Sequence, residues 1–227
     1  MTAQKNKKIS RDELSQGSTI REYPDFFINQ KNKKITSKNL GEKTAALNSY
    51  FFEYIKEYNV PSAYLNKVNK KSIVFLKVEE FPFRIRIINT ADTRTSKIFS
   101  IKVGSPLQLP VMEYHFGNTK ESLITESHII SFNLCTYDEL KLINRICSKL
   151  NAIIKSFFER RNVLLLELTC RFGRFEGKVL LIDDFSTLSI KTSFDKTDTK
   201  FPDPFKIETA AQMNKYADYL QKLTRGE

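Results

Sequence analysis

The chain has 227 residues, of which 41% are hydrophobic and 28% are charged, and its formal net charge is +11. This composition is typical of a globular protein with one domain or two closely joined subdomains. No stretch approaches the roughly 20 apolar residues that a membrane-spanning helix requires, and Met1 to Arg11 lack the apolar core of a secretory signal. We therefore expect a cytoplasmic protein with no membrane partner.

The positive charge suits three kinds of partner: nucleic acid, an anionic membrane surface or a phosphorylated small ligand. Much of the charge lies in the N-terminal tail and between Asn29 and Lys43, and a basic run of this kind is usually a solvated surface. The sequence has no RNA-recognition signature and no helix-turn-helix spacing. These observations disfavour nucleic acid, and charge alone does not choose among the partners.

The cysteines do not form a recognisable framework. Cys135, Cys147 and Cys170 are odd in number, widely spaced and surrounded by apolar residues. This pattern predicts reduced core thiols rather than disulfides or a zinc site.

The first predicted helix covers Lys43 to Tyr58, where apolar residues recur at spacings of three and four. Two strands follow, at Ser72 to Glu79 and at Pro82 to Asn89. In the second strand, apolar residues alternate with Arg84 and Arg86, which predicts a half-buried strand with a basic outer face.

The longest predicted helix begins at a capping box, Thr136-Tyr137-Asp138-Glu139, in which the Thr and Glu side chains satisfy backbone N–H groups reciprocally. An apolar stripe continues from there to about Arg160, which is long enough to lie across a sheet.

Two further strands and a last helix complete the pattern. The strands are expected at Val163 to Thr169 and Lys178 to Ile182, with a glycine-marked connection at residues 171–177, and the helix at Glu208 to Thr224. Strands followed by helices mixed with strands favour an α+β fold over a doubly wound sheet.

The sharpest candidates for chemistry are Asp183 and Asp184, directly after an apolar strand. Because an unpaired buried charge is costly, at least one carboxylate should emerge at the edge of a cleft. Carboxylates in such places commonly hold the Mg²⁺ of a bound nucleotide. A turn-forming Asp pair at a strand end is the alternative, and composition alone leaves it open.

Several short motifs follow one another between about Leu47 and Asp195. NVPS follows the first helix, VMEYHF and TESHI come next, and LELTCRFG at residues 166–173 precedes VLLIDDFS at residues 179–186. This ordered set resembles the SAICAR (phosphoribosylaminoimidazole-succinocarboxamide) synthetases, whose elements are close to G-I-P-T, P-I-I-E-F-Y-Y, T-E-E-H-I, V-D-F-K-x-E-F-G and D-E-x-S-P-D.

The resemblance implies an α+β fold in which a smaller β-rich N-terminal part covers ATP and packs on a larger mixed-sheet part with helices that holds the substrates. We place the first part at residues 13–90 and the second at 91–227, after a basic tail at 1–12. It also implies an ATP-dependent amide ligase of de novo purine biosynthesis: ATP phosphorylates the carboxylate of an aminoimidazole ribonucleotide, and the aspartate nitrogen displaces phosphate. In such chemistry Lys, Arg and Mg²⁺ offset the charge on the transferring phosphoryl group.

The resemblance also assigns roles to individual residues. The expected cofactor-binding residues are Gly17, Glu167 and Asp183. The expected ligands of Mg²⁺ are Asp183 and Asp184. The expected catalytic cations are Arg94 and Lys191, the latter in place of an arginine and without its bidentate geometry.

The sequence departs from the family at its charged positions. The lysines of the family's Y-x-G-K-A-K loop are absent after Gly17, and residues 87–94 lack both arginines of V-R-N-R-A-A-G-S at their places, with an arginine only at the last position, Arg94. Arg171 stands where the D-F-K-x-E pattern has a metal-binding carboxylate, and its charge would repel Mg²⁺. The hydrophobic pattern is retained, as in a scaffold whose activity has been altered or lost.

Three functions therefore stay open at this stage. The first is a divergent amide ligase that uses ATP and Mg²⁺. The second is a catalytically silent or repurposed paralogue, which keeps the fold as a module that binds a phosphorylated ligand or regulates. The third, a basic nucleic-acid binder, rests on charge alone. His115 and His128 are expected to be structural residues, and a homo-oligomer is an open possibility.

Overall fold

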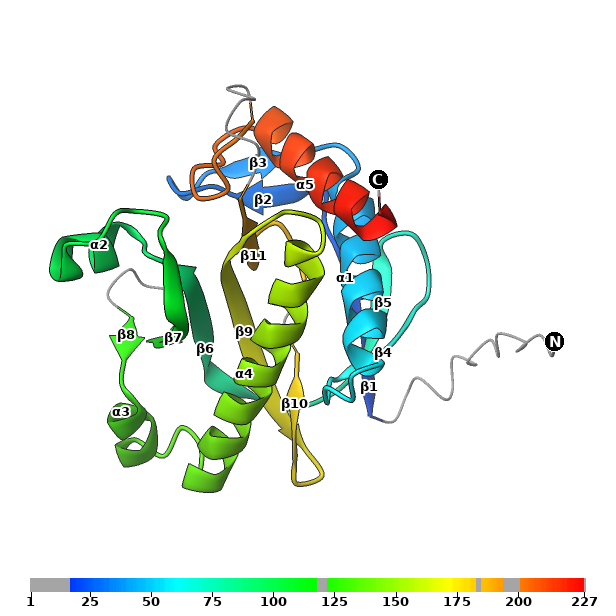
Figure 1. Cartoon of the computed structure of the whole chain (residues 1–227). Helices are drawn as coiled ribbons and strands as arrows, with labels where there is room; N and C mark the ends of the chain where they lie inside the picture. The colour runs from blue at the N-terminus through cyan, green and yellow to red at the C-terminus, as the bar shows by residue number, and fades with distance from the viewer. Residues whose placement is uncertain (1–16, 118–121, 183–184, 194–200, 227) are drawn as a thin grey trace.

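The computed structural model describes residues 17–117, 122–182, 185–193 and 201–226, which form three antiparallel sheets and five helices (Figure 1). The helices are α1 (Leu40–Lys56), α2 (Thr93–Phe99), α3 (Glu126–Ser131), α4 (Tyr137–Glu159) and α5 (Ala210–Arg225). None of these helices is long and apolar enough to cross a membrane.

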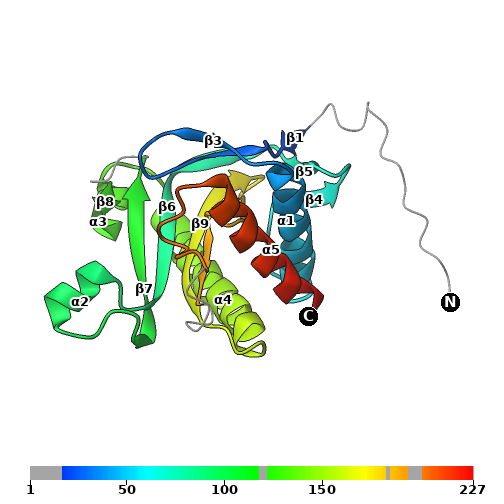
Figure 2. The same ribbon diagram turned by 90° about the horizontal axis from the view of Figure 1, so that it is seen from above.

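The largest sheet has the strand order β10-β9-β6-β7-β8, and a further strand, β11, pairs with β9. Its strands are β6 (Glu79–Thr90), β7 (Pro106–Phe116), β8 (Leu123–Ile124), β9 (Leu165–Phe175), β10 (Lys178–Leu181) and β11 (Ile190–Thr192). One face of this sheet is covered by α4, which runs along β9 and β10 (Figures 1 and 2). The opposite face carries the polar side chains described below.

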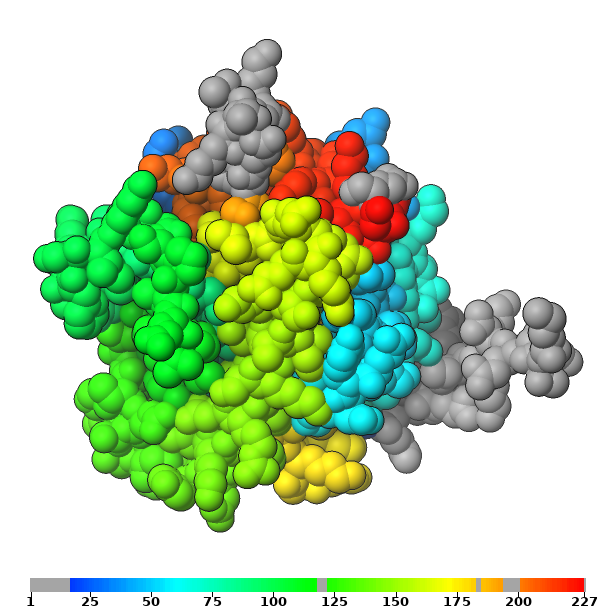
Figure 3. Space-filling model, in the orientation of Figure 1, coloured from blue at the N-terminus to red at the C-terminus, as the bar shows by residue number. Residues whose placement is uncertain are grey.

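A second sheet has the order β1-β5-β4 and packs against α1. Its strands are β1 (Ser18–Glu22), β4 (Tyr64–Lys67) and β5 (Ser72–Leu76), and a separate hairpin is formed by β2 (Phe26–Ile28) and β3 (Lys34–Thr36). On one face of the molecule α4, α1 and α5 lie side by side and form a continuous helical surface (Figure 3). Their buried faces contribute to a single hydrophobic core.

The capping signals of the sequence are realised in the structure. Thr136 accepts a hydrogen bond from the backbone N–H of Glu139, and the Glu139 carboxylate accepts one from the Thr136 N–H at 2.8 Å. Thr209 and Gln212 form the same arrangement at the start of α5. Both arrangements satisfy N–H groups that a helix N-terminus leaves without an intrahelical partner. The predicted long helix and last helix are therefore confirmed.

A bulge in β6 sets the direction of its arginines. Glu80 lies opposite Gly173 of β9 and Arg84 lies opposite Arg171, so three residues of β6 stand against one of β9. Pro82, which has no N–H to donate to a ladder, occupies this bulge. Phe81 and Phe83 are both buried. From Arg84 onward the strand alternates between the core and the polar face.

The predicted α+β class is confirmed, and one local expectation is wrong. Residues 171–175 are not a connection, because they continue β9 and pair with β6 on one side and β10 on the other. Only Glu176 and Gly177 form the turn, and both have positive φ angles. The predicted reduced core thiols are confirmed, since all three cysteines are buried and free. The division at residue 90 stays a prediction, and the basic tail at 1–12 lies outside the described residues.

We predict that Gly41→Ala destabilises the fold, although alanine is the better helix former. A Cβ atom at Gly41 would lie 2.1 Å from the backbone oxygen of Tyr23, and backbone cannot move aside cheaply. Overpacking of this kind costs about 1–3 kcal/mol. Urea denaturation measures the loss, with Glu53→Ala on the exposed side of the same helix as the control. Equal stability of the two variants would contradict this account of the α1 start.

Candidate functional site

The candidate site lies on the face of the main sheet opposite α4. Because side chains alternate along a strand, Phe83, Ile85 and Ile87 of β6 enter the core, and Arg84 and Arg86 lie on the other face. Arg84 is opposite Arg171 of β9 and His115 of β7, and Arg86 is opposite Thr169 and Glu113. Two rows of polar side chains therefore cross three neighbouring strands. The first row is His115, Arg84 and Arg171, and the second row is Glu113, Arg86 and Thr169.

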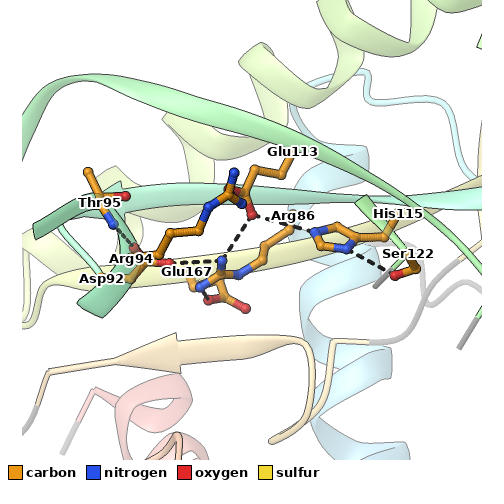
Figure 4. Close-up of polar contacts among 8 residues, drawn as sticks. All are labelled: Arg86, Asp92, Arg94, Thr95, Glu113, His115, Ser122 and Glu167. Carbon is orange, nitrogen blue, oxygen red and sulfur yellow. Dashed lines mark hydrogen bonds and ion pairs between the residues drawn. The ribbon is translucent and has the colours of Figure 1, made fainter. Parts of the chain in front are cut away.

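Arg86 is the centre of an ion cluster, which we call the Arg86 cluster and define as Arg86, Asp92, Glu113, Glu167 and Arg94 (Figure 4). Arg86 Nη1 lies 3.0 Å from a carboxylate oxygen of Asp92 and 3.0 Å from one of Glu113. Its Nη2 lies 2.6 Å from Glu167 Oε2. Arg94 reaches the other oxygen of Glu113 at 3.1 Å. One guanidinium thus contacts three carboxylates.

The ion pairs and hydrogen bonds of the Arg86 cluster offset the cost of partly burying its charged side chains. Burial alone would lower the pKa of Arg86, but the carboxylates of Glu167, Asp92 and Glu113 raise it above its ordinary value. Burial would likewise raise the pKa of Asp92, and hydrogen bonds from Thr95 and Arg86 outweigh it, so that this pKa is lowered. Asp92 caps α2 by accepting from the Thr95 N–H at 2.7 Å. The cluster therefore ties α2 to the sheet.

Lys191 lies beside the cluster, directly opposite Glu167 in the β11–β9 pairing. Its ammonium donates to the backbone oxygen of Thr187 at 2.8 Å. Burial lowers the pKa of Lys191 to about 8, although the nearby Glu167 carboxylate acts in the opposite direction. At neutral pH Lys191 is thus mostly a cation, but it loses its proton at a lower pH than an exposed lysine does.

His115 stays neutral at pH 7. Burial, followed by the charge of Arg84, lowers the pKa of its imidazole, and Glu113 only partly opposes this. The ring Nδ1 lies 3.2 Å from Ser122 Oγ, and Nε2 lies 3.5 Å from Glu113 Oε2 (Figure 4). The ring is therefore within hydrogen-bonding distance of Ser122 and lies close to the Glu113 carboxylate, at the end of the first polar row.

An open cavity of about 580 Å³ lies over the first row, which we call the sheet cavity. It is lined by Glu80, Phe81, Pro82, Phe83, Arg84, His115, Gly117, Thr169, Arg171, Leu188 and Ser189. Its described walls thus carry two guanidinium groups, one carboxylate and two hydroxyls. This balance favours an anionic ligand.

A second cavity of about 300 Å³ lies between β1, β5 and the end of β10, and we call it the β1 cavity. Ala63, Phe75 and Ile182 give it apolar walls, and its charged lining is two cations, Arg21 and Lys77, and one carboxylate, Glu80. The Arg21 guanidinium lies 4.7 Å from the centre of the Phe75 ring and donates to the Ile182 oxygen at 3.2 Å. An apolar slot edged by cations can hold a nucleotide base together with its phosphates.

Comparison with known proteins identifies the family of this chain. The family model described as SAICAR synthetase matches residues 26–203. The chain belongs to the SAICAR synthetase family.

Relatives and solved structures agree with this family assignment. The phosphoribosylaminoimidazole-succinocarboxamide synthase of Clostridium botulinum (strain Langeland) is 25% identical over 224 residues, which cover 97% of this chain and 96% of the relative. That of Clostridium novyi is 28% identical over 184 residues, which cover 80% and 78%. SAICAR synthetase from Pyrococcus horikoshii shares the fold with a TM-score of 0.82 at 20% identity, covering 94% of this chain and 95% of that one. A SAICAR synthetase in complex with ADP gives a TM-score of 0.81 at 20% identity.

The structure brings together three of the residues predicted from the resemblance. Glu167, Arg94 and Lys191 all lie in or beside the Arg86 cluster. Gly17 lies elsewhere, at the start of β1, where its φ angle is +102° and its oxygen accepts from the Lys77 N–H at 2.9 Å. The next two residues, Ser18 and Thr19, line the β1 cavity. The roles of all four stay predictions.

The predicted Mg²⁺ ligands Asp183 and Asp184 lie outside the described residues. Within residues 17–117, 122–182, 185–193 and 201–226, no group of three or more His, Cys, Asp or Glu side chains forms a metal site. Glu167 is engaged by Arg86 at 2.6 Å. Arg171 places a positive charge where the family resemblance calls for a carboxylate. The described residues therefore do not fit a Mg²⁺ ion, and Mg²⁺ stays a prediction that rests on the aspartate pair.

Sequence reasoning missed the residues that organise this family member's site: Arg86, Asp92, Glu113 and Arg84. The alternation of arginines in β6 correctly predicts a polar face, but it gives no sign that Arg86 is half-buried among carboxylates. Asp92 lies six residues after Arg86, at the N-cap of α2. Glu113 and Glu167 come from the distant strands β7 and β9, and the strand register brings them to the same guanidinium.

We predict that Arg86→Met lowers the free energy of unfolding by about 3 kcal/mol at pH 7, because removing one partner leaves buried carboxylates uncompensated. Arg145→Met, an exposed arginine of α4, should be nearly neutral.

The difference in the free energy of unfolding between the wild type and Arg86→Met should shrink as the pH falls towards about 4. In the wild type, Asp92 has a lowered pKa and its stabilising contribution is lost on acidification. In the variant, unpaired carboxylates have raised pKa values, so protonation relieves the folded state. Denaturant titrations at several pH values measure both curves. A deficit that does not change with pH would contradict the ionic role of Arg86.

Proposed function

We propose that this chain is an ATP-dependent carboxylate–amine ligase of the SAICAR synthetase type that acts in de novo purine biosynthesis in the cytoplasm. The observation that carries the proposal is the extent of the family correspondence. A curated relative with this activity in its name aligns over 97% of this chain and 96% of its own length. The alignment therefore covers nearly the whole length of that relative.

The β1 cavity is the candidate nucleotide site. Phe75 and the neighbouring apolar walls suit a base, and Arg21 and Lys77 suit phosphate oxygens. The turn at Gly17 leads directly into this cavity, and no atom of the described residues lies within 4 Å of a Cβ atom placed there. A solved SAICAR synthetase with the same fold was determined in complex with ADP. These points support ATP as the cofactor.

In this proposal the protein's own cations handle the developing charge. Bound ATP would supply the phosphoryl group that activates a carboxylate. Lys191 and Arg94 lie near the second polar row, where the Thr187 backbone oxygen accepts from Lys191 and Glu113 pairs with Arg94. A cation positioned in advance costs little reorganisation when charge develops. Asp183 and Asp184 remain the residues that would hold Mg²⁺.

A second candidate function is favoured by the Arg86 cluster. Three carboxylates saturate Arg86, and Glu113 also holds Arg94, so neither arginine is ready to receive an anionic substrate without breaking an ion pair. A catalytically silent paralogue that binds a phosphorylated ligand would show this arrangement. The two candidates differ in turnover and need not differ in nucleotide binding.

We predict that ATP raises the melting temperature of the purified protein, because a ligand that binds only the native state stabilises it by mass action. Arg21→Gln should reduce the shift, and Arg225→Gln, in the last turn of α5 and away from the β1 cavity, should not. Repeating the scan with Mg²⁺ and with a chelator tests the aspartate pair. No shift at millimolar ATP would contradict the nucleotide site.

The ligase itself is tested by turnover. ADP release should depend on both a carboxylated aminoimidazole ribonucleotide and aspartate, and mass spectrometry should detect the amide product. ATP binding without any such turnover would select the silent paralogue over the ligase.

A further inference from the structure

We propose that the outer face of α4 docks an acidic helix of another protein through a row of three cations. The row consists of Lys141, Arg145 and Lys149, and we call it the α4 cation row. It lies on the far side of the main sheet from the candidate site, because α4 covers the opposite face (Figure 2). The inference goes beyond the proposed function and depends on neither the ligase nor the silent paralogue.

The three cations stand on one face of the helix. Residues four apart in an α-helix are neighbours on its surface, about 6 Å apart along the axis. All three side chains are exposed, and the buried residues of α4 occupy the opposite side. Figure 3 shows the outer surface of α4 open at the front of the molecule. A partner can therefore reach the whole row at once.

The charges of the row are not neutralised within the described part of the chain. Neither Lys141 nor Arg145 has an ion pair or a side-chain hydrogen bond with any residue that the structure describes. Lys149 donates to the backbone oxygen of Asn59 at 3.3 Å, which leaves its charge uncompensated. Lys155, further along the same helix, instead pairs with Glu159 at 3.7 Å.

The stability of the helix does not account for the row. Like charges four residues apart repel one another on a helix surface. The helix dipole favours cations near the C-terminus, yet Lys141 and Arg145 lie in the N-terminal half of α4 and its last turn contains no basic residue. Exposed positions tolerate many polar residues. A run that breaks these local preferences therefore indicates a binding role.

The surface beside the row suits a helix as the partner. Ser148, Ala152 and Ser156 form a second line of exposed residues at the same spacing. The Ser148 hydroxyl donates to the backbone oxygen of Asn144 at 2.9 Å, so it lies against its own helix. Small side chains allow a close approach, because the separation of two packed helices depends on the side chains between them. Acidic side chains on such a helix can then reach the cations.

Apolar residues next to the row favour a protein over nucleic acid. Tyr137, one turn before Lys141, is 69% exposed, and Leu142 is 37% exposed. Aromatic side chains are enriched in protein interfaces. Three cations neutralise only about three phosphates. A single row on the convex surface of one helix also differs from the charged groove in which proteins hold a single strand.

The charge of the row argues against a second copy of this chain as the occupant. A two-fold contact would place the same surface patch of both copies together. The cations would then face cations and repel. The chemistry that complements the row is a set of carboxylates at four-residue spacing, as on an acidic helix.

Fluorescence anisotropy of the full chain at low ionic strength, where screening is weak, tests the inference. The probe is a labelled synthetic peptide of repeated Glu-Ala-Ala-Ala units, about 20 residues long, which places a glutamate at every fourth position of a helix. Lys141→Glu/Arg145→Glu should weaken binding about tenfold, because attraction becomes repulsion at two contacts. A peptide of the same composition with its glutamates spread around the helix should bind less tightly.

The matched control is Lys97→Glu/Lys102→Glu, which changes the net charge by the same amount. Both lysines are exposed, in α2 and the segment after it, and α2 lies away from α4 in Figures 1 and 2. The control should leave the affinity unchanged. The double variant in α4 should melt no lower than the wild type, because the helix dipole favours anions at these positions. Its loss of binding is then not a loss of folding.

An unchanged affinity in the α4 double variant, or an equal loss in the control, would overturn the inference. Equal binding of the two peptides would overturn the match in spacing on which it depends. A labelled oligouridylate that binds more tightly than the acidic peptide, with the same dependence on Lys141 and Arg145, would replace the protein helix with nucleic acid. Ligase turnover should be the same in the α4 variant and the wild type, so failure of the proposed ligase leaves the inference standing.

Discussion

The contact between Arg86 and its three carboxylates is the interaction on which the rest of the site depends. It joins the N-cap of α2 to β6, and it joins β6 to Glu113 of β7 and Glu167 of β9. These elements carry the polar side chains of the site, and a guanidinium with several donors can contact all of them at once. Because the charges are only partly exposed, they are screened less than a surface pair. Arg84, His115 and Arg171 lie on the same three strands that the contacts of Arg86 connect.

The cluster also divides the polar face into two regions with different chemistry. In the second row the positive charges of Arg86 and Arg94 are satisfied by carboxylates within the protein. In the first row Arg84 and Arg171 face a cavity whose described walls contain a single carboxylate.

The sequence predicted best those features that depend on neighbours in the chain. Thr136 and Glu139 act within one turn, so the start of α4 was readable from four residues. The alternation in β6 is equally local. By contrast, the position of Arg171 depends on its pairing with Arg84 of β6, and its segment was wrongly expected to be a connection. Helix and strand periodicity carries no information about such register.

The candidate site shows the same limit. Motif spacing led to Glu167, Arg94 and Lys191, which the fold does bring to one place. It did not lead to Arg86, because a lone arginine in a strand resembles any solvated side chain until its acidic partners are placed. The role of Asp183 and Asp184 is a prediction from their place after an apolar strand and from the family motif. Charge patterns in a sequence show which residues are present, and only the strand register shows which of them neutralise one another.

The most direct test of this account is a crystal structure of the protein with ATP bound in the absence of divalent cations. The account predicts ATP in the β1 cavity with its phosphates near Arg21 and Lys77, and with the contacts of Arg86 to Asp92, Glu113 and Glu167 intact. A structure in which phosphate binds only together with a metal ion held by Glu167, with Arg86 displaced from that carboxylate, would contradict it.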